Sequence, residues 1–243
     1  MKKQINLVIN GKGGVGKSFF AVNLVQYLKD RGTSLLAIDT DNENSTLKRF
    51  HSEATFVNIT KPQSLDAMFS SLESNSLLVV DCRAASTDIF LNYFDELNVL
   101  DMLAQMDVSL TVVSPINHEN DSLKQLQVLS DRIGDHCNYV VVKNQSFSEQ
   151  FIIYEKSKTR AHLLKELGAK EIEMPKLQDW LVVGLNQTGC TISAALRSAS
   201  FSVMDRQRLK NWQQRFYEQL DSLRTLLAPN LPSKVKQQTG AIL

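Results

Sequence analysis

The stretch Ile5–Asn10 followed by Gly11–Ser18 reads Ile-Asn-Leu-Val-Ile-Asn and then Gly-Lys-Gly-Gly-Val-Gly-Lys-Ser. The first segment is mostly apolar and typical of a buried strand, and the second has the spacing GxxxxGK[ST] of a phosphate-binding loop. A helix-like run starts directly after the loop, which completes the strand–loop–helix order that the motif needs. Loop N–H groups and the helix N-terminus both attract phosphate oxygens. The stretch therefore predicts an ATP site.

The residues around this loop suggest how a magnesium ion would be held. Lys17 is expected to reach the β- and γ-phosphates, and the Ser18 hydroxyl is expected to bind Mg²⁺. The apolar run Leu77–Val80 ends in Asp81. Because Mg²⁺ keeps several of its waters, we expect Asp81 to hold it through the water shell.

A second apolar run, Leu35–Ile38, also ends in carboxylates, those of Asp39 and Asp41. In an extended chain, side chains two positions apart point the same way. Both carboxylates could therefore face the γ-phosphate and its attacking water. One aspartate at a strand end is often only a turn former, but two such strands after a phosphate loop favour a shared site.

Seven strand-like runs recur along the chain, and most are continuously apolar, as expected for strands covered on both faces. They are Ile5–Ile9, Leu35–Ile38, Phe56–Ile59, Leu77–Val80, Leu110–Val113, Tyr139–Val142 and Ile172–Met174. Segments of helical length lie between or after them: Ser18–Lys29, Thr87–Gln105, Asn120–Ile133, Glu149–Leu167 and Asp205–Leu227. Such alternation implies right-handed crossovers. We predict an α/β P-loop NTPase fold in three layers, with a mainly parallel, twisted sheet flanked by helices.

The C-terminal part divides into a helix and a tail. Residues 1–228 are expected to form one P-loop ATPase domain, and residues 229–243, with two prolines and many polar residues, a flexible tail. The last helix carries a single apolar stripe at spacings of three and four residues. Its members are Leu209, Trp212, Phe216, Leu220, Leu223 and Leu227. The stripe predicts packing on the same domain or, alternatively, a surface for a partner.

The composition limits the remaining possibilities. A hydrophobic content of 43% and a net charge of +1 indicate an ordinary globular protein without whole-molecule attraction to nucleic acid. Three scattered cysteines form no CxxC pair, which favours a reducing compartment. The first residues do not resemble a signal peptide, and no run of eighteen apolar residues occurs. We expect a cytoplasmic protein without stable membrane insertion.

The loop resembles one family in particular. Lys12–Ser18 matches KGGxGK[ST], the deviant Walker A motif of the ParA/MinD ATPases. This resemblance implies a homodimer that forms around ATP and hydrolyses it slowly, with Lys12 reaching the nucleotide of the partner subunit. A cation delivered in this way would neutralise charge on the transferred phosphoryl group.

The resemblance also implies roles for single residues. Lys12, Lys17 and Asp41 would act in catalysis, Asp41 by orienting the attacking water. Ser18, Asp39 and Asp81 would lie on the metal side. The nucleotide would be bound by Gly11, Lys12, Gly13, Gly14, Val15, Gly16, Lys17, Ser18, Phe19, Asn144 and Pro175. Of these, Asn144 would read the adenine edge, or else serve only as a turn residue, and Pro175 would border the base.

Three stretches are similar to TraL proteins of plasmid conjugation systems, which are themselves ParA-like: Gly11–Phe19, Ile38–Thr46 and Met204–Lys210. This resemblance implies a role in conjugative transfer, partition or positioning of plasmid DNA or a protein cargo, together with an activating partner protein. One departure concerns Asp81–Thr87, which lacks the proline or glycine that the family places after the metal-side aspartate. Arg83, in this segment, could contact phosphate or a partner subunit, or lie in solvent.

Two alternatives stay open. The first is an ATP-dependent small-molecule synthetase or kinase on the same fold, although Lys12 favours the switch. The second concerns five basic residues near the C-terminus, which could bind DNA nonspecifically or form the solvated face of the last helix. They are Arg197, Arg206, Arg208, Lys210 and Arg215.

Overall fold

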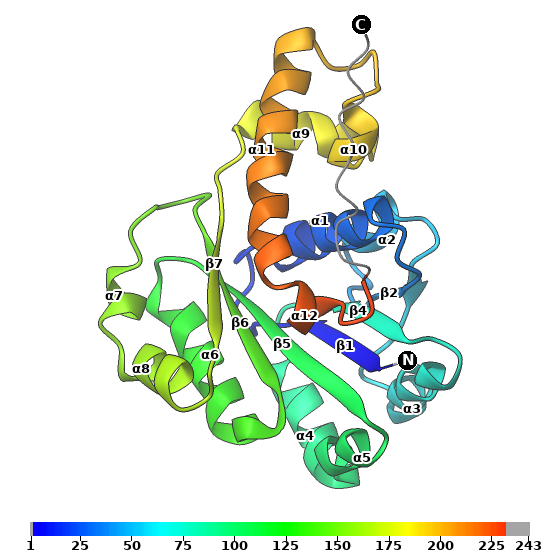
Figure 1. The fold of residues 1–243 in the computed structure, drawn as a ribbon, viewed down its shortest axis with the longest axis vertical. Helices are drawn as coiled ribbons and strands as arrows, with labels where there is room; N and C mark the ends of the chain where they lie inside the picture. Colours follow the sequence, from blue (N-terminus) through cyan, green and yellow to red (C-terminus); the bar gives the residue numbers. More distant parts are fainter. Residues whose placement is uncertain (1, 232–243) are drawn as a thin grey trace, which may run out of the picture.

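A seven-stranded sheet forms the centre of the computed structural model, which describes residues 2–231 (Figure 1). The strands lie in the order β3-β2-β4-β1-β5-β6-β7, and every neighbouring pair is parallel. Their bounds are β1 Lys3–Val8, β2 Leu36–Asp39, β3 Thr55–Phe56, β4 Leu77–Asp81, β5 Val108–Ile116, β6 Asn138–Asn144 and β7 Lys170–Met174. The predicted fold class is confirmed.

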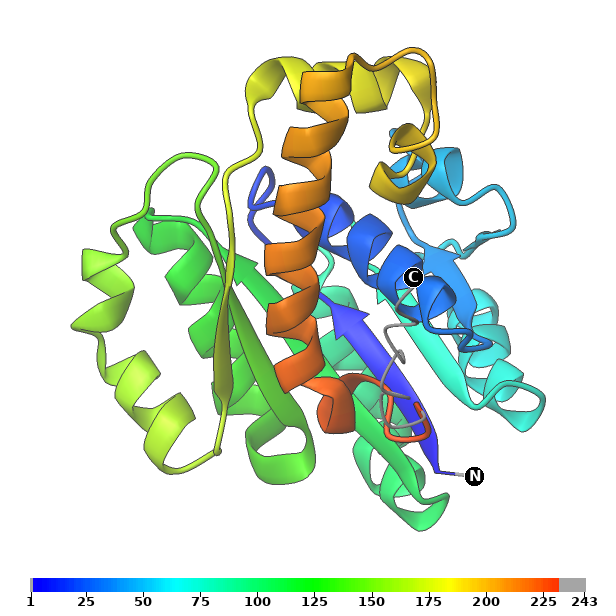
Figure 2. The same ribbon diagram turned by 45° about the horizontal axis from the view of Figure 1, so that its top comes forward.

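Helices cover both faces of the sheet (Figures 1 and 2). One face is covered by α3 (Pro62–Ser70), α4 (Thr87–Leu97), α5 (Val99–Gln105), α6 (Asn120–Ile133), α7 (Ile152–Glu155) and α8 (Lys158–Lys165). The other is covered by α1 (Lys17–Asp30), α2 (Thr46–Phe50), α9 (Asp179–Thr188), α10 (Ile192–Ala195), α11 (Val203–Ser222) and α12 (Arg224–Leu227). Because side chains alternate along each strand, the sheet contributes to both cores, and this explains the continuously apolar strands.

The apolar stripe of α11 packs inside the molecule and not on a partner. Its residues are buried in the core that α11 shares with α1, and Phe216 contacts Phe20 with ring centroids 5.7 Å apart. In Figure 2, α11 lies across the sheet beside α1. Of the two interpretations of this stripe, packing on the same domain is the one observed.

Buried polar side chains on the central strands hold α12 against the sheet by hydrogen bonds. Asn6 Nδ2 donates to the Leu227 carbonyl at 2.7 Å, and Thr111 Oγ1 donates to the Leu226 carbonyl at 2.9 Å. Gln4 Nε2 donates to Thr111 Oγ1 at 2.9 Å. These bonds satisfy polar side chains that lie on otherwise apolar central strands, and they attach the end of the last helices to β1 and β5.

Two long predicted helices are divided. The one over residues 87–105 breaks at Asn98, whose φ of 48° lies in the left-handed region that ends a helix. The one over residues 149–167 consists of α7 and α8, with Ser157 capping α8 through a bond from the Arg160 N–H. Helices α2, α3, α9 and α10 were not predicted from the sequence, because they are short or carry weak apolar patterns.

The predicted tail begins on the body of the molecule. Asn230 Nδ2 donates to the Lys2 carbonyl at 2.6 Å, and Leu231 is buried. Residues 232–243 of that segment lie outside the described residues, so the boundary at 228 stays a proposal. Within residues 2–231, no helix is both long and apolar enough to cross a bilayer.

Candidate functional site

The glycine-rich loop connects the carboxyl end of β1 to the start of α1, beside the ends of β4 and β5 (Figure 1). Gly16 has a φ of 95°, and a Cβ there would lie 2.4 Å from Asn144 Nδ2. A side chain at this position would therefore be strained and would also clash. Gly11 is required by packing, since a Cβ there would lie 2.9 Å from Thr87 Oγ1.

The two lysines of the loop are held in different ways. Lys17 is buried, and its Nζ donates to the Lys12 carbonyl at 2.9 Å across the loop. Burial lowers the pKa of Lys17, while the charge of Asp81 opposes that effect. Lys12 is half-exposed, and its Nζ lies 3.4 Å from Glu119 Oε2 and 3.5 Å from Asp121 Oδ2. These two acids were not predicted from the sequence, because they follow β5, far along the chain from the loop.

Asp39 and Asp81 are neighbours across the sheet, where β2 and β4 pair in register. Both are buried, but only Asp39 has its oxygens satisfied. Asp39 Oδ1 accepts from the Asp41 N–H at 2.9 Å, and Oδ2 accepts from the Lys48 N–H at 3.0 Å. Asp39 thus organises the loop that leads from β2 to α2.

The Asp81 carboxylate is an unsatisfied acidic group of the site within residues 2–231. Neither of its oxygens has a hydrogen-bond partner in this part of the chain. The pKa of Asp81 is raised to about 7, chiefly by burial and further by the Asp39 charge, with the Ser18 hydroxyl and Lys17 acting in the opposite direction. An orphaned carboxylate is costly, so its position beside Lys17 and Ser18 fits a divalent cation between phosphate and protein.

The oxygen ligands that Ser18 and Asp81 could supply suit magnesium. No group of three His, Cys, Asp or Glu in the described part of the chain could hold a metal. A cation here would depend on the Ser18 hydroxyl, phosphate oxygens and water in addition to Asp81. Mg²⁺ accepts such a partial protein shell, because it retains several of its waters. The metal roles given to Ser18, Asp39 and Asp81 stay predictions.

Asp41 is oriented differently from the direction that strand alternation predicted. Strand β2 ends at Asp39, so the chain is not extended as far as Asp41. The Asp41 carboxylate turns to its own loop, where Oδ1 accepts from the Glu43 N–H at 2.9 Å and the Asn44 N–H at 3.2 Å. Burial raises the pKa of Asp41, but these bonds, the Asn44 side chain and the Arg83 charge outweigh it, and the net pKa is lowered. In this state Asp41 orders the loop between β2 and α2.

The segment after Asp81 is fastened to both neighbouring loops. Thr40 Oγ1 donates to the Asp81 carbonyl at 3.0 Å and accepts from the Arg83 N–H at 2.9 Å. The Ala85 N–H donates to the Gly11 carbonyl at 3.0 Å. Ala85 has a φ of 55°, a left-handed conformation that glycine adopts without strain. The segment therefore has the shape that a glycine would favour, although it contains none.

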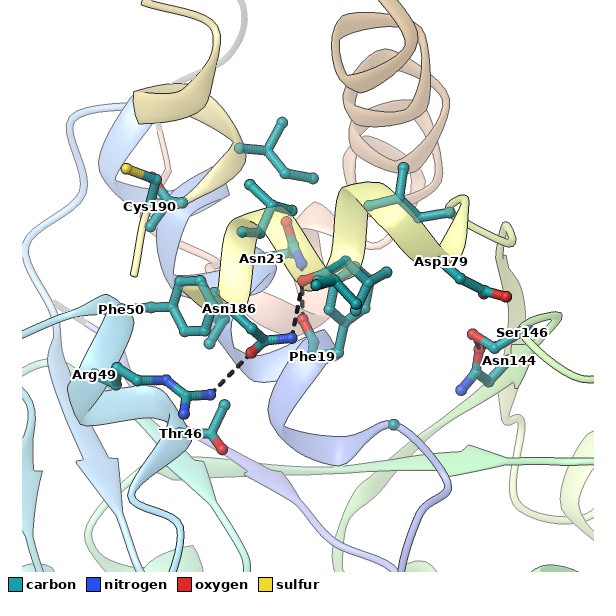
Figure 3. Close-up of a pocket in the computed structure, with 18 of the residues that line it drawn as sticks. Phe19, Asn23, Thr46, Arg49, Phe50, Asn144, Ser146, Asp179, Asn186 and Cys190 are labelled. Carbon is teal, nitrogen blue, oxygen red and sulfur yellow. Dashed lines mark hydrogen bonds between the residues drawn. The ribbon is translucent and has the colours of Figure 1, made fainter. Parts of the chain in front are cut away.

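A cavity of about 470 Å³ opens beside the loop, between α1, α2, α9 and the β6–α7 connection (Figure 3). Near the loop it is lined by Gly16, Phe19, Asn144 and Ser146, and farther on by apolar side chains of α9 and α10. Pockets of this size and character hold small ligands. Figure 3 shows Asn144, Ser146 and Asp179 at one end and Arg49, Phe50 and Cys190 at the other.

The residues predicted to surround the base are placed near this cavity, but with partners of their own. Asn144 Nδ2 donates to the Val15 carbonyl at 3.0 Å, so its amide supports the loop from beneath. The Pro175 carbonyl accepts from Trp212 Nε1 at 2.8 Å, and Trp212 packs edge-on against Phe19 at 5.4 Å. The roles of Asn144 and Pro175 toward a base stay predictions.

Other residues of the cavity were not predicted from the sequence. Leu177 and Asp179 line it, and Arg49 NH2 donates to Asn186 Oδ1 at 2.9 Å across it. These residues come from short elements without a motif, so no local signal pointed to them.

The five basic residues near the C-terminus do not form one patch. Arg206 NH1 donates to the Ser198 and Phe201 carbonyls at 3.1 and 2.6 Å, so it braces the turn before α11. Arg208 and Arg215 are exposed and two helical turns apart, hence on one side of α11, whereas Lys210 lies on another. Arg197 precedes the helix.

Comparison with known proteins relates this geometry to a family. The family described as CobQ/CobB/MinD/ParA nucleotide binding domain matches residues 7–238. Protein MobD of Acidithiobacillus ferrooxidans is 29% identical over 219 residues, covering 87% of this chain and 94% of MobD. A Protein TraL of Escherichia coli is 29% identical over 245 residues, covering 92% of this chain and 99% of TraL.

Solved structures share the fold. The septum site-determining protein MinD complexed with Mg-ADP, from Pyrococcus horikoshii OT3, superposes with a TM-score of 0.54 at 15% identity, covering 92% of this chain and 99% of MinD. A chain of the MinC:MinD cell division protein complex of Aquifex aeolicus gives a TM-score of 0.53 at 15% identity, with coverages of 89% and 96%. At these identities the likeness concerns the fold alone.

Proposed function

Because this chain belongs to the family of CobQ/CobB/MinD/ParA nucleotide binding domains, we propose that it is a Mg²⁺-dependent ATPase that switches between a monomer and an ATP-bound homodimer. The observation that carries the proposal is the buried Asp81 carboxylate beside the phosphate loop, which has no hydrogen-bond partner among residues 2–231. An ionised carboxylate in that position favours a cation beside it, and the N–H groups of a glycine-rich loop at a helix start favour an anion. Mg²⁺ bound to the phosphates of ATP supplies both.

Each residue of the site has a task in this scheme. Lys17 Nζ would give up its hydrogen bond to the Lys12 carbonyl and bind the β- and γ-phosphates instead. Ser18 and Asp81 would hold the magnesium ion. Mg²⁺, when bound, would neutralise charge on the β- and γ-phosphates. The Asp41 loop would orient a water that attacks the γ-phosphorus while the bond to the bridging oxygen breaks. The electron pair of that bond leaves with ADP, and the proton of the water passes to phosphate or solvent.

Dimerisation would complete the site through Lys12. In the described chain its ammonium is half-exposed and contacts acids of its own subunit. Once it has left these acids, Lys12 would reach the nucleotide of the partner subunit and couple hydrolysis to dimer formation. The resemblance of the loop to the deviant Walker A motif supports this proposal.

The biological process that we propose is plasmid transfer or partition, carried out in the cytoplasm with an activating partner protein. Similarity to MobD and TraL over most of the chain supports it. MinD is found in complex with MinC, and an activating partner of this chain would by analogy be a protein. Nonspecific DNA binding through Arg208 and Arg215 is a further part of the proposal.

The test is a measurement of mass and turnover with ATP and Mg²⁺ and without any other substrate. We expect slow hydrolysis and an ATP-dependent dimer in the wild type. In Asp41→Ala we expect an accumulated ATP-bound dimer with reduced turnover, while the matched surface variant Asp101→Ala behaves like the wild type. A monomeric Asp41→Ala variant with undiminished turnover would defeat both the dimer and the role of Asp41. Hydrolysis that needs a small-molecule acceptor would instead favour a synthetase.

A further inference from the structure

The backbone of the segment Cys82–Ser86, which contains Arg83, lies against the phosphate loop of its own subunit. Arg83 stands two residues after Asp81, and its backbone is fixed by the bond from its N–H to Thr40 Oγ1 at 2.9 Å. Next to it, a Cβ on Gly13 would lie 3.7 Å from the Ala84 Cβ. Together with the bond from Ala85 to Gly11, these contacts place Arg83 between the loop and the end of β2.

One nitrogen of the Arg83 guanidinium, Nε, lacks an acceptor within residues 2–231. This nitrogen is also shut off from solvent. No ion pair of Arg83 occurs in the same part of the chain, and the charge of Arg83 contributes to lowering the pKa of Asp41. A buried donor without an acceptor is unfavourable, and more so when it is charged.

The two lysines of the loop already have hydrogen-bond or ion-pair partners. Lys17 is bonded to the Lys12 carbonyl, and Lys12 contacts Glu119 and Asp121. Arg83 has a nitrogen, Nε, without a hydrogen-bond partner in the described part of the chain, and a planar guanidinium can bind phosphate oxygens through two parallel bonds. Arg83 follows Asp81 at the carboxyl end of β4, and its charge acts on Asp41. It therefore lies on the side of the loop where we expect the terminal phosphate of a bound nucleotide.

We propose that Arg83 binds the γ-phosphate of ATP within its own subunit and thereby distinguishes ATP from ADP. This inference rests on the proposed function, since it needs the loop to hold a nucleotide. The segment would then link recognition of the γ-phosphate directly to the two loops that it touches. Loss of the γ-phosphate would free Arg83 from its acceptor and release the constraint on Thr40 and Gly11.

The test compares the binding of a non-hydrolysable ATP analogue and of ADP, both with Mg²⁺, by calorimetry at protein concentrations below dimerisation. In Arg83→Gln we expect affinity for the ATP analogue to fall about 10- to 100-fold, as for a charged hydrogen-bond pair, and affinity for ADP to change less than about twofold. Arg83→Lys should show an intermediate loss, because it keeps the charge but not the planar fork. The control Arg132→Gln removes an exposed arginine on α6 and should change neither affinity.

The outcomes separate this inference from the proposed function. A wild type that binds neither nucleotide would defeat the proposed function. If the wild type binds both nucleotides and Arg83→Gln loses affinity for the ATP analogue and for ADP equally, the inference is overturned and Arg83 has a structural role. An unchanged ATP-analogue affinity, or a loss seen only at concentrations at which dimers form, would also overturn it. If Arg83→Gln fails to fold by thermal melting, Arg83→Lys serves for the same comparison.

Discussion

Lys12 Nζ lies 3.4 Å from Glu119 Oε2, so the lysine that we expect to act on a partner's nucleotide is paired within its own subunit. Asp121 Oδ2, at 3.5 Å, adds a second carboxylate. The hydrogen bond and the charge of Glu119 raise the pKa of Lys12, which keeps the ammonium cationic. To cross an interface, Lys12 must leave both acids, and the pair therefore opposes assembly.

Neutralising these acids should favour the dimer. In a Glu119→Gln, Asp121→Asn double variant, we expect ATP-dependent dimerisation at a protein concentration lower by at most about fivefold, because exposed ion pairs contribute little. Sedimentation with ATP and Mg²⁺ measures the shift. The matched control Glu96→Gln, Asp101→Asn changes two exposed acids of α4 and α5. A weaker dimer in the first variant would mean that the acids orient Lys12 and do not retain it.

The ligand-free protein should gain stability when the charge of Asp81 is removed. The folded pKa of about 7 exceeds the unfolded value, so ionisation of Asp81 costs stability as the pH rises from about 4 to 7. We expect Asp81→Asn to raise the free energy of unfolding at pH 8 by on the order of 1 kcal/mol or more, and to flatten its pH dependence. Denaturant unfolding without nucleotide measures this. In the same variant, Mg²⁺ should no longer strengthen ATP binding. If Mg²⁺ still strengthens ATP binding in Asp81→Asn, Asp81 does not take part in holding the metal.

The left-handed Ala85 gives a stability prediction at the switch segment. An L-residue in that region costs about 1–2 kcal/mol, whereas glycine adds about 0.4–1 kcal/mol of backbone entropy to the unfolded chain. Ala85→Gly should therefore stabilise the protein by about 0–1.6 kcal/mol. The control Ala84→Gly, at a neighbour without a positive φ, should destabilise it. Equal destabilisation by both substitutions would mean that Ala85 is not strained.

The parts of the molecule that could be predicted from the sequence are those with local signatures. Six of the strands and the loop Gly11–Ser18 follow from runs of adjacent residues, and α6 begins and ends where predicted. Strand β3, Thr55–Phe56, shares only Phe56 with the predicted run Phe56–Ile59. The break at Asn98 depends on one residue entering a left-handed conformation, which the apolar pattern does not reveal. Elements such as α2 and α9 derive their stability from tertiary packing and carry weak local patterns.

Side-chain partners across long sequence distances were not predictable in the same way. The loop motif identified Lys12, but nothing near it in sequence pointed to Glu119. Alternation suggested that Asp39 and Asp41 share a direction, yet β2 ends at Asp39 and the Asp41 carboxylate closes its own loop. A strand pattern gives the direction of side chains only as far as the strand extends.

His51 makes stability depend on pH in mildly acidic solution. Its Nε2–H donates to the Val22 carbonyl at 2.9 Å, and Nδ1 accepts from Lys29 Nζ at 3.1 Å, so the ring is held neutral. Burial lowers the pKa of His51. Its stabilising contribution is therefore complete above the unfolded pKa of about 6.5 and is lost as the pH falls below it. We expect His51→Gln to reduce the loss of stability between pH 7 and pH 5 in denaturant titrations, and the half-exposed control His162→Gln to have a smaller effect. An unaltered pH slope in His51→Gln would contradict this.

Two sets of arginine variants separate DNA binding from stability on α11. Arg208 and Arg215 are exposed on one side of the helix, so the salt slope of DNA binding should fall by about 0.9 for each phosphate interaction that the Arg208→Gln, Arg215→Gln variant removes. That variant should retain the stability of the wild type. Arg206→Gln leaves the Ser198 and Phe201 carbonyls without their charged donor and should destabilise the protein by about 1–3 kcal/mol, with little effect on the salt slope. Gel shifts over a salt series, with and without ATP, and thermal melts measure the two quantities. Wild-type binding that ignores both ATP and salt would reject this surface as a DNA-binding site.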